Sequence, residues 1–314
     1  MTISSEIAAP SVDDPYDTYM CELVREGLLI PSGVPGVVGR GGVFEDVLQR
    51  FDRFVTRMGA AEGATVMRFP SIMPRAHFEQ SGYLKSFPQL IGSVFSFTGN
   101  EHDHNDLLRM LNRGEDWSKR LTPTDVVLTP AACYPVYPIA AARGPLPGGG
   151  LQFDIEADVF RHEPSRSLDR LQSFRMREFV RIGSAHEILL FREQWLAKSP
   201  ALAADLGVPF TIEVANDPFF GRVGQVMAIS QRQQALKFEL LIRYHASAAP
   251  TACMSFNYHR DHFGQAWSIR DDRGETAHTG CVAFGIDRLA VALFAVHGLD
   301  LKKWPAPTQV ALAL

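Results

Sequence analysis

The chain has 314 residues, of which 46% are hydrophobic and 21% charged, and its formal net charge is −4. This length can bury a large core in one big domain or two modest ones, and the composition is that of a globular protein. The negative charge argues against bulk electrostatic binding to nucleic acid, and no apolar run approaches the roughly 20 residues of a membrane span.

The composition of the N-terminus and the spacing of the cysteines bear on the cellular compartment of the protein. The first 14 residues contain acids but no lysine or arginine, which is unlike a secretory signal peptide. The four cysteines are widely spaced, and this usage favours a reducing environment in which thiols serve packing or metal binding. We therefore expect a cytoplasmic protein without a membrane partner.

The N-terminal half predicts a mixture of helices, strands and loops. A short helix is expected over 19–27, and the proline- and glycine-rich stretch 31–42 predicts a loop or linker. Apolar side chains in 43–58 recur at the spacing of an amphipathic helix, and 65–69 predicts a short strand that Pro70 ends. Further elements are expected as mixed loop and helix at 73–90, strands at 94–98 and 126–129, and a helix at 105–111.

The clearest pattern is a β-hairpin over 151–180. In its first strand apolar and polar side chains alternate, which is strand periodicity. The apolar face of this strand continues into Arg161 and Glu163, and the second strand, which begins at Phe174, carries Glu178 on its apolar face. A buried charge is costly unless it is paired, hydrogen-bonded or bound to metal. These three charges therefore either reach solvent at frayed strand ends or belong to a site.

The C-terminal half predicts a helix over 185–198 and a strand over 279–285 that passes into a helix over 286–297. Short strands are expected at 211–214, 237–243, 253–257 and 265–269, with a loop at 216–221. Strands separated by long insertions, with few βαβ alternations, indicate an α+β fold around an antiparallel sheet.

Three segments resemble the signature motifs of class II aminoacyl-tRNA synthetases. Residues 160–163 and 174–179, on either side of the hairpin loop, are similar to motif 2, and 280–288 is similar to motif 3. Residues 66–70 resemble the weaker motif 1, which implies a homodimer. The resemblance implies the catalytic fold of that class, an antiparallel sheet flanked by helices.

Within that class, the chain is most similar to the zinc-dependent, methanogen-type seryl-tRNA synthetase. That enzyme holds its metal with two cysteines and a glutamate, which match Cys133, Glu178 and Cys281. Its large tRNA-binding arm has no counterpart in the N-terminal segment and linker, 1–42, that precedes the expected catalytic domain, 43–314. This combination resembles the amino acid:[carrier protein] ligases, truncated homologues of the synthetase for which no tRNA substrate is expected.

The metal site depends on this resemblance, because the spacing of the three ligands matches no zinc-finger pattern. Taken alone, Cys133 and Cys281 would be interpreted as ordinary buried cysteines. The resemblance implies one Zn²⁺ per subunit, held by Cys133, Glu178 and Cys281. Three protein ligands leave a fourth position open, as in catalytic zinc sites. The substrate amine would bind there, beside Glu178, which thereby also contacts the substrate.

The resemblance also implies an ATP site. Arg161 and Arg288 would flank the polyphosphate as the catalytic pair, because the arginine fork makes bidentate contacts with phosphate oxygens. Glu163 would accept a hydrogen bond from the adenine amino group, and Mg²⁺ would accompany ATP in a number that the sequence leaves open. Further nucleotide contacts are expected from Arg170, Leu171, Lys237, Ala252, Cys253, Met254 and Ser255, although Lys237 could equally form a surface ion pair.

Two histidine pairs, His102 with His104 and His259 with His262, invite a second metal interpretation. Neither pair lies on a motif that requires metal, and we interpret both as solvated loops. If His259 or His262 lies near the pocket, its ring would order the substrate or the acceptor thiol.

The implied function is ATP-dependent activation of a small amino acid, glycine first and alanine second, as an aminoacyl adenylate. The aminoacyl group would pass to the phosphopantetheine thiol of a carrier protein, because a thiol is a better nucleophile than a ribose hydroxyl near neutral pH. Two alternatives are a truncated synthetase that charges tRNA or another acceptor, and a non-catalytic regulatory paralogue that binds an amino acid. The side chains expected to narrow the amino-acid pocket are Met176, Phe256, Asn257 and Trp267.

Carrier proteins are typically acidic, so their docking surface should be basic. The helix from Ala185 to Leu206 is the expected dock, provided that Trp195 and Leu196 are exposed beside Arg192 and Lys198.

Overall fold

The computed structural model describes residues 15–165, 167, 170–244 and 249–314, so the N-terminal residues 1–14 lie outside the described part. Within the described residues, seven strands form one sheet, in which all neighbours are antiparallel except the edge pair β3–β7. In spatial order they are β3 (Thr65–Arg68), β7 (Leu151–Phe160), β8 (Ser173–Gly183), β12 (His278–Gly285), β11 (Thr251–Arg260), β10 (Lys237–Ile242) and β9 (Phe210–Val214). The expected α+β fold around an antiparallel sheet is confirmed.

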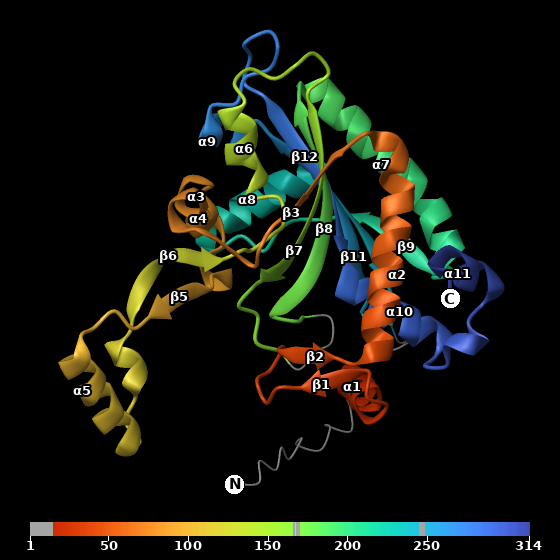
Figure 1. The fold of residues 1–314 in the computed structure, drawn as a ribbon. Helices are drawn as coiled ribbons and strands as arrows, with labels where there is room; N and C mark the ends of the chain where they lie inside the picture. The colour runs from red at the N-terminus through yellow and green to blue at the C-terminus, as the bar shows by residue number, and fades with distance from the viewer. Residues whose placement is uncertain (1–14, 166, 168–169, 245–248) are drawn as a thin grey trace.

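Long helices cover one face of this sheet (Figure 1). They are α2 (Gly42–Gly59), α7 (Ala185–Leu206) and α10 (Ile286–His297), with α11 (Ala306–Leu312) packed beside them. α7 begins at Ser184, whose side chain accepts the N–H of Glu187 in a capping box, and it ends at Gly207 with φ 64. Among the helices of the described residues, none combines the length and apolar character needed to cross a membrane.

The opposite face of the sheet carries shorter helices (Figure 1). α6 (Val136–Ala142) and α9 (His262–Trp267) cover a second apolar core formed with β7 and β8. α3 (Arg75–Gln80), α4 (Tyr83–Ser86) and α8 (Gly221–Gln233) lie on the same side. The space between these short helices and the central strands contains the candidate site described below.

The predicted hairpin forms the second and third strands of the large sheet, beside the edge strand β3. β7 pairs antiparallel with β8, and Ile155 lies opposite Glu178, so this carboxylate lies on the apolar face as expected. The other face of β8 buries a second charge, because the Arg177 guanidinium is fully covered by Asp154 and Asp52 at 2.5 and 2.8 Å. That ion-paired cluster joins the hairpin to α2.

A small sheet extends away from the main body (Figure 1). It consists of β4 (Ile72–Pro74), β6 (Thr122–Leu128) and β5 (Ser93–Ser96), in that spatial order. α5 (Glu101–Asn112) and the 3-10 turn η3 (Trp117–Arg120) form its tip. α5 begins at Asn100, which makes a capping box with Asp103. Further 3-10 turns are η1 (Ala60–Glu62), η2 (Pro88–Leu90) and η4 (Leu301–Lys303).

The N-terminal region forms α1 (Pro15–Arg25) and a hairpin of β1 (Leu29–Pro31) and β2 (Val38–Arg40). The stretch 31–42, expected as a loop or linker, therefore contains a strand. Leu23 and Leu29 belong to the same apolar core as α10. The domain boundary at residue 42 stays a prediction.

Two C-terminal elements differ from expectation. The strand expected at 265–269 is wrong, because α9 occupies 262–267 and ends at Ser268 with φ 54. Periodicity alone cannot distinguish a short buried helix from a strand. α8 was not expected, although its apolar residues Val223, Val226 and Met227 recur at helical spacing.

Candidate active site

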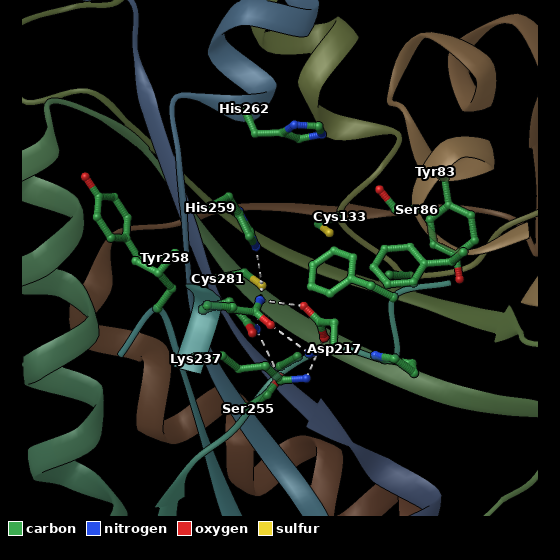
Figure 2. Close-up of a pocket in the computed structure, with 18 of the residues that line it drawn as sticks. Tyr83, Ser86, Cys133, Asp217, Lys237, Ser255, Tyr258, His259, His262 and Cys281 are labelled. Carbon is green, nitrogen blue, oxygen red and sulfur yellow. Dashed lines mark hydrogen bonds and ion pairs between the residues drawn. The ribbon is translucent and has the colours of Figure 1, made fainter. Parts of the chain in front are cut away.

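A cavity of about 560 Å³ lies between the central strands and the short helices. Its floor consists of side chains from β8, β10, β11 and β12, and its walls come from α4, α8 and α9. Figure 2 shows polar and sulfur-bearing side chains from these elements pointing toward one another, among them Lys237, His259 and Cys281. The segments that supply them are far apart in the sequence, so the cavity exists only in the folded chain.

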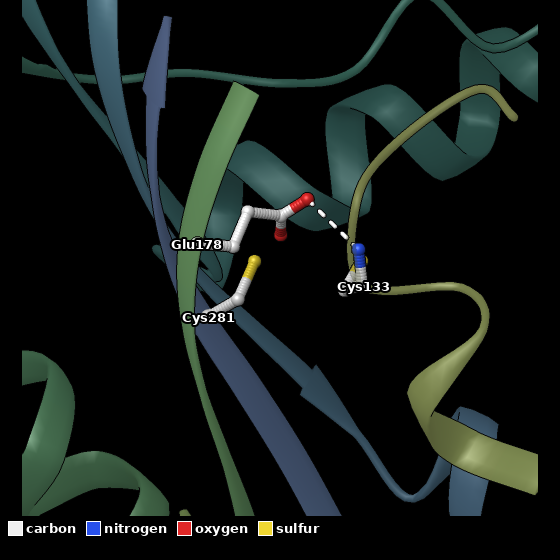
Figure 3. A group of neighbouring side chains, drawn as sticks. All are labelled: Cys133, Glu178 and Cys281. Atoms are coloured by element: carbon white, nitrogen blue, oxygen red, sulfur yellow. Dashed lines mark hydrogen bonds between the residues drawn. The ribbon is translucent and has the colours of Figure 1, made fainter. Parts of the chain in front are cut away.

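Cys133, Glu178 and Cys281 meet in this cavity (Figure 3). Glu178 is on β8, Cys281 is on the neighbouring β12, and Cys133 is in the turn before α6. Their ligand atoms all lie within 4.8 Å of one another, and all three residues are buried. The backbone N–H of Cys133 donates to Glu178 Oε1 at 3.1 Å, which fixes the position of the cysteine relative to the carboxylate.

This donor set fits a zinc ion. Two thiolates and a carboxylate are ligands that Zn²⁺ binds in proteins, and three of them leave one tetrahedral position open. The neighbouring Cys133 thiol and burial raise the pKa of Cys281 well above its usual range. Because metal binding needs the thiolate, a bound cation would reverse this effect.

Two side chains on β11 contact the Cys281 sulfur. Asn257 Nδ2 donates to it at 3.3 Å, and His259 Nε2 lies 3.7 Å away. Nδ1 of His259 is 3.1 Å from the Thr279 hydroxyl, and burial lowers the pKa of His259 to about 4, so its ring is neutral. These contacts can orient Cys281 toward a metal, as outer partners of metal ligands do.

The interpretation of His259 as part of a solvated loop is therefore wrong, because it is on a strand in the cavity wall. His262 begins α9, also lines the cavity, and contacts the Ser81 carbonyl through Nε2 at 2.9 Å. The other pair, His102 and His104, is exposed on α5 and not in a loop. The polar sequence from His259 to His262 predicts a loop, but β11 continues into it, because polar residues can also occupy the end of a strand.

The two predicted nucleotide arginines face the same cavity from different elements, and Arg288 is on a helix and not on a strand. Arg161 follows β7 and donates to the Pro130 carbonyl at 3.0 Å, while its guanidinium lies 5.7 Å from the ring centre of Phe174. Arg288, in the first turn of α10, donates to the Ala252 carbonyl at 2.9 Å. Both side chains are thus held by main-chain oxygens that leave other guanidinium nitrogens for a ligand.

The remaining predicted nucleotide residues divide into two groups. Glu163 and Arg170 are 3.4 Å apart, and Leu171 is buried in the second core; these three lie beyond the cavity lining. The four β11 residues expected at the ribose, Ala252, Cys253, Met254 and Ser255, all line the cavity, although Cys253 and Met254 are nearly covered.

Lys237 also lines the cavity, but it is ion-paired. Its ammonium lies 2.6 Å from Asp217 and 2.9 Å from Glu239. Burial by itself raises the pKa of the Asp217 carboxyl, but Lys237, the hydrogen bond from Gln231 and the charge of Arg161 together hold that pKa below its usual range. Gln231 on α8 donates to the same carboxylate at 2.8 Å. The loop 216–221 carried no sequence signal for a role of Asp217, because its partners come from α8 and β10.

Two of the four residues expected to narrow the amino-acid pocket are elsewhere. Met176 and Asn257 line the cavity beside the metal-ligand group. Phe256 points to the opposite face of β11 and is fully buried in the core under α7. Trp267, at the end of α9, packs edge-on against His77 with ring centres 5.2 Å apart.

The helix expected to dock a carrier protein is part of the core. On α7, Trp195 is fully buried and stacks on Phe179 at 4.7 Å, and Leu196 is partly buried. Arg192 donates to the Ala235 carbonyl, and Lys198 pairs with Glu62. The condition for docking is not met, so this expectation is wrong.

α8, unlike α7, presents an exposed apolar surface. Phe220, Val223, Val226, Met227 and Ile229 are exposed at its start and along its length, by between 43% and 76%. Val226 and Met227 also line the cavity, so the exposed apolar side chains border its mouth.

Comparison with known proteins places the chain among ligases. No protein-family model matches it. It is 53% identical over 311 residues to amino acid--[acyl-carrier-protein] ligase 1 of Bradyrhizobium diazoefficiens, covering 99% of this chain and 94% of the relative. Ligase 2 of the same organism is 53% identical over 308 residues, with 98% and 92% coverage. A type-2 serine--tRNA ligase of Methanopyrus kandleri is 27% identical over 76% of this chain and 49% of its own length.

Solved structures support the same fold. The seryl-tRNA synthetase of M. kandleri, in complex with A. aeolicus tRNASec, superposes with a TM-score of 0.79 at 22% identity, over 94% of this chain and 60% of that one. Prolyl-tRNA synthetase of Giardia lamblia gives 0.65 at 12% identity, over 90% and 51%. The class II synthetase fold predicted from the motifs is confirmed.

Proposed function

The chain belongs to the amino acid--[acyl-carrier-protein] ligases, and from this premise we propose that it activates a small amino acid with ATP and transfers it to the phosphopantetheine thiol of a carrier protein. The observation that carries the proposal is one cavity that contains two arginines, a Cys–Glu–Cys group and a border of exposed apolar side chains. Activation needs the first two features, and docking of a carrier needs the third.

Amino-acid binding is assigned to the metal-ligand group. Cys133, Glu178 and Cys281 would hold one Zn²⁺, which when bound supplies a positive centre that fixes the substrate amine and lowers its pKa. Glu178 lies on the strand next to Cys281 and so also borders the amino acid. Met176 and Asn257 close the cavity beside this group, which favours glycine, with alanine as the second choice.

Adenylate formation is assigned to Arg161 and Arg288. The substrate carboxylate attacks the α-phosphate in line, and pyrophosphate leaves as its bond to the α-phosphorus breaks. The chain must therefore hold both reacting groups in position and balance the negative charge that develops. Two guanidinium groups, one from the segment after β7 and one from the first turn of α10, can bind the polyphosphate on two sides, and Mg²⁺ would accompany ATP. Glu163 would accept a hydrogen bond from the adenine amino group, and the loop of Arg170 and Leu171, which lies beyond the cavity lining, would cover ATP. Residues 252–255 would line the ribose.

Lys237 contributes to the nucleotide site through its ion pairs. Together with Asp217 and Glu239 it forms a group with one positive and two negative charges. Because its net charge is negative, this group attracts a polyphosphate poorly by itself. A polyphosphate would be attracted only if Mg²⁺ bound between the carboxylates and the phosphates, or if the lysine moved from the carboxylates to the phosphates. We therefore assign Lys237 to the phosphate end of ATP, with Asp217 holding it before the nucleotide arrives.

Carrier docking is assigned to α8. Its sequence contains Arg222 and Arg232 and no acidic residue, and its apolar side chains are exposed at the cavity mouth. A basic helix with an apolar face complements an acidic carrier. The phosphopantetheine arm would enter beside Val226 and Met227 and reach the adenylate inside.

The subunit arrangement is proposed from the edge of the large sheet. β3 pairs with β7 on one side, no other strand among the described residues pairs with its second edge, and Val66 is 61% exposed. This is the segment that resembles motif 1, so we propose a homodimer formed along β3. The cytoplasm is the proposed location.

The function is tested by incubating the protein with ATP, glycine and either holo-carrier, apo-carrier or tRNA. Amino-acid-dependent pyrophosphate exchange should occur with glycine and, more weakly, alanine, and a thioester should form only with holo-carrier. An ester on tRNA without any on the carrier would establish the truncated synthetase instead. Glycine binding without any exchange would establish the regulatory paralogue.

A further inference from the structure

The β1–β2 hairpin contacts the proposed nucleotide site although it lies outside every recognised motif. Its turn, residues 32–37, is closed by the Ser32 hydroxyl, which donates to the Val37 carbonyl at 2.7 Å and accepts the Val34 N–H at 3.1 Å. The turn is therefore a built structure that can present its own carbonyl groups to another segment.

Gln172 receives this turn. Its backbone N–H donates to the Gly36 carbonyl at 2.7 Å, and its side-chain amide donates to the Pro35 carbonyl at 2.7 Å. Gln172 is buried, and its own carbonyl accepts the backbone N–H of Arg161 at 2.9 Å. Gln172 thus joins the hairpin turn to the main chain of Arg161. Arg170 and Leu171 directly precede Gln172 in the chain.

The other end of the hairpin reaches the second arginine. Arg40 on β2 makes a bidentate pair with Asp287, at 2.7 and 3.1 Å. Asp287 is buried, precedes Arg288 in the chain, and accepts the backbone N–H of Arg175 at 2.6 Å. One carboxylate therefore connects the hairpin, the start of α10 and β8.

We infer that the hairpin 29–40 is a positioning element of the nucleotide site, which holds the segments of Arg161 and Arg288 at a set separation through Gln172 and Asp287. The inference rests on the proposed function, because that function assigns both arginines to ATP. None of the hairpin residues needs to touch the nucleotide. Small displacements of catalytic groups cost large factors in rate, so loosening the hairpin should weaken ATP use and leave the metal-ligand group intact.

Two glycines of the turn provide a matched test. Gly33 and Gly36 have φ values of +87 and +75, so alanine is strained at both. At Gly33 an added Cβ meets nothing within 4 Å, whereas at Gly36 it comes within 3.1 Å of both the Arg170 carbonyl oxygen and Gln172 Cγ. Gly33→Ala therefore reproduces the backbone strain, and Gly36→Ala adds a displacement of the segment that carries Gln172.

The experiment compares these variants in the full chain by two measurements. Hydrogen–deuterium exchange of the peptide 170–175, without any ligand, reports the segment itself, and pyrophosphate exchange gives KM for ATP and for glycine. Both variants should lose thermal stability, and Gly36→Ala should lose at least as much as Gly33→Ala. Gly36→Ala alone should speed hydrogen–deuterium exchange in 170–175. It should also raise KM for ATP roughly tenfold and leave KM for glycine unchanged.

Arg40 gives an independent arm. Arg40→Ala should raise KM for ATP, and Arg40→Lys should recover part of the loss because it keeps the charge without the bidentate fork. Arg113→Ala, which removes an exposed ion pair with Glu115, should change neither constant. Equal effects of the two glycine variants on the exchange of 170–175 would overturn the inference. A wild-type protein that activates no amino acid would refute the proposed function. The hydrogen–deuterium exchange of 170–175 would still decide the inference about the hairpin.

Discussion

Glu178 shows how one charged side chain defines a site. It occupies an apolar position on β8, where its carboxylate is almost fully covered and accepts the Cys133 N–H. Arg177, its neighbour, is equally buried but is neutralised by Asp154 and Asp52. The difference lies in the partners: Arg177 is balanced within the fold, whereas Glu178 faces two thiols and a cavity, which is the environment of a metal ligand.

Replacing Cys133 by alanine should remove the metal without unfolding the protein. Two remaining ligands bind zinc weakly, so metal measured by mass spectrometry should fall from about one ion per subunit to near zero. Glycine-dependent pyrophosphate exchange should fall by roughly 100-fold or more. Cys21→Ala is the control, because Cys21 lies outside the group. Full activity of a metal-free Cys133→Ala protein would contradict the assignment.

α8 is a helix whose apolar side chains are exposed and do not pack into the core. Its sequence has helical spacing of apolar residues, yet Gly224 is the residue that it buries within the described chain. The helix is tied to the site by Gln231, which exchanges two hydrogen bonds with Asp217, at 2.7 and 2.8 Å. An exposed apolar helix that is anchored to a cavity wall is typical of an interaction surface.

Placing a negative charge on α8 should weaken carrier binding and spare activation. Val223 is 76% exposed, so Val223→Asp costs little stability but opposes an acidic partner. KM for the holo-carrier should rise roughly tenfold, with pyrophosphate exchange unchanged. Val310→Asp on α11, at a position 80% exposed, is the matched control. An unchanged KM for the carrier in Val223→Asp would show that the carrier docks elsewhere.

β3 is one of the two edge strands of the large sheet, and within the described part of the chain it pairs with β7 alone. Exposed apolar side chains occur at Val66 on β3 and on two strands of the small sheet, at Ile72 on β4 and Phe95 on β5. An open edge with apolar neighbours invites pairing with another strand unless it is covered. A second copy of the chain would cover it.

Sedimentation should therefore show twice the chain mass of 34.8 kDa at micromolar concentration. Val66→Lys should shift the equilibrium toward the single chain, because a charged side chain on an edge strand opposes pairing. Thr122→Lys, on the smaller sheet, serves as the control. A wild-type protein that sediments as a single chain would refute the homodimer.

Local patterns were sufficient for the elements that contain their own signal. The alternation in β7 and β8 predicted the central hairpin and placed Glu178 on its apolar face, and the motif segments 160–163, 174–179 and 280–288 predicted the class of fold. Strand periodicity and motif spacing are properties of neighbouring residues, so they can be recognised before the chain is folded.

Partners that are distant in the chain were beyond such patterns. Asp217 meets Lys237 because β9 pairs with β10, which brings the loop after β9 beside the start of β10. Phe256 and Trp267 lie outside the predicted pocket because tertiary packing decides which face of a strand, and which side of a helix end, is turned toward the cavity. Trp195 has the composition of a docking residue and is buried against Phe179. Whether an apolar side chain faces solvent, core or cavity depends on what the rest of the molecule places opposite it.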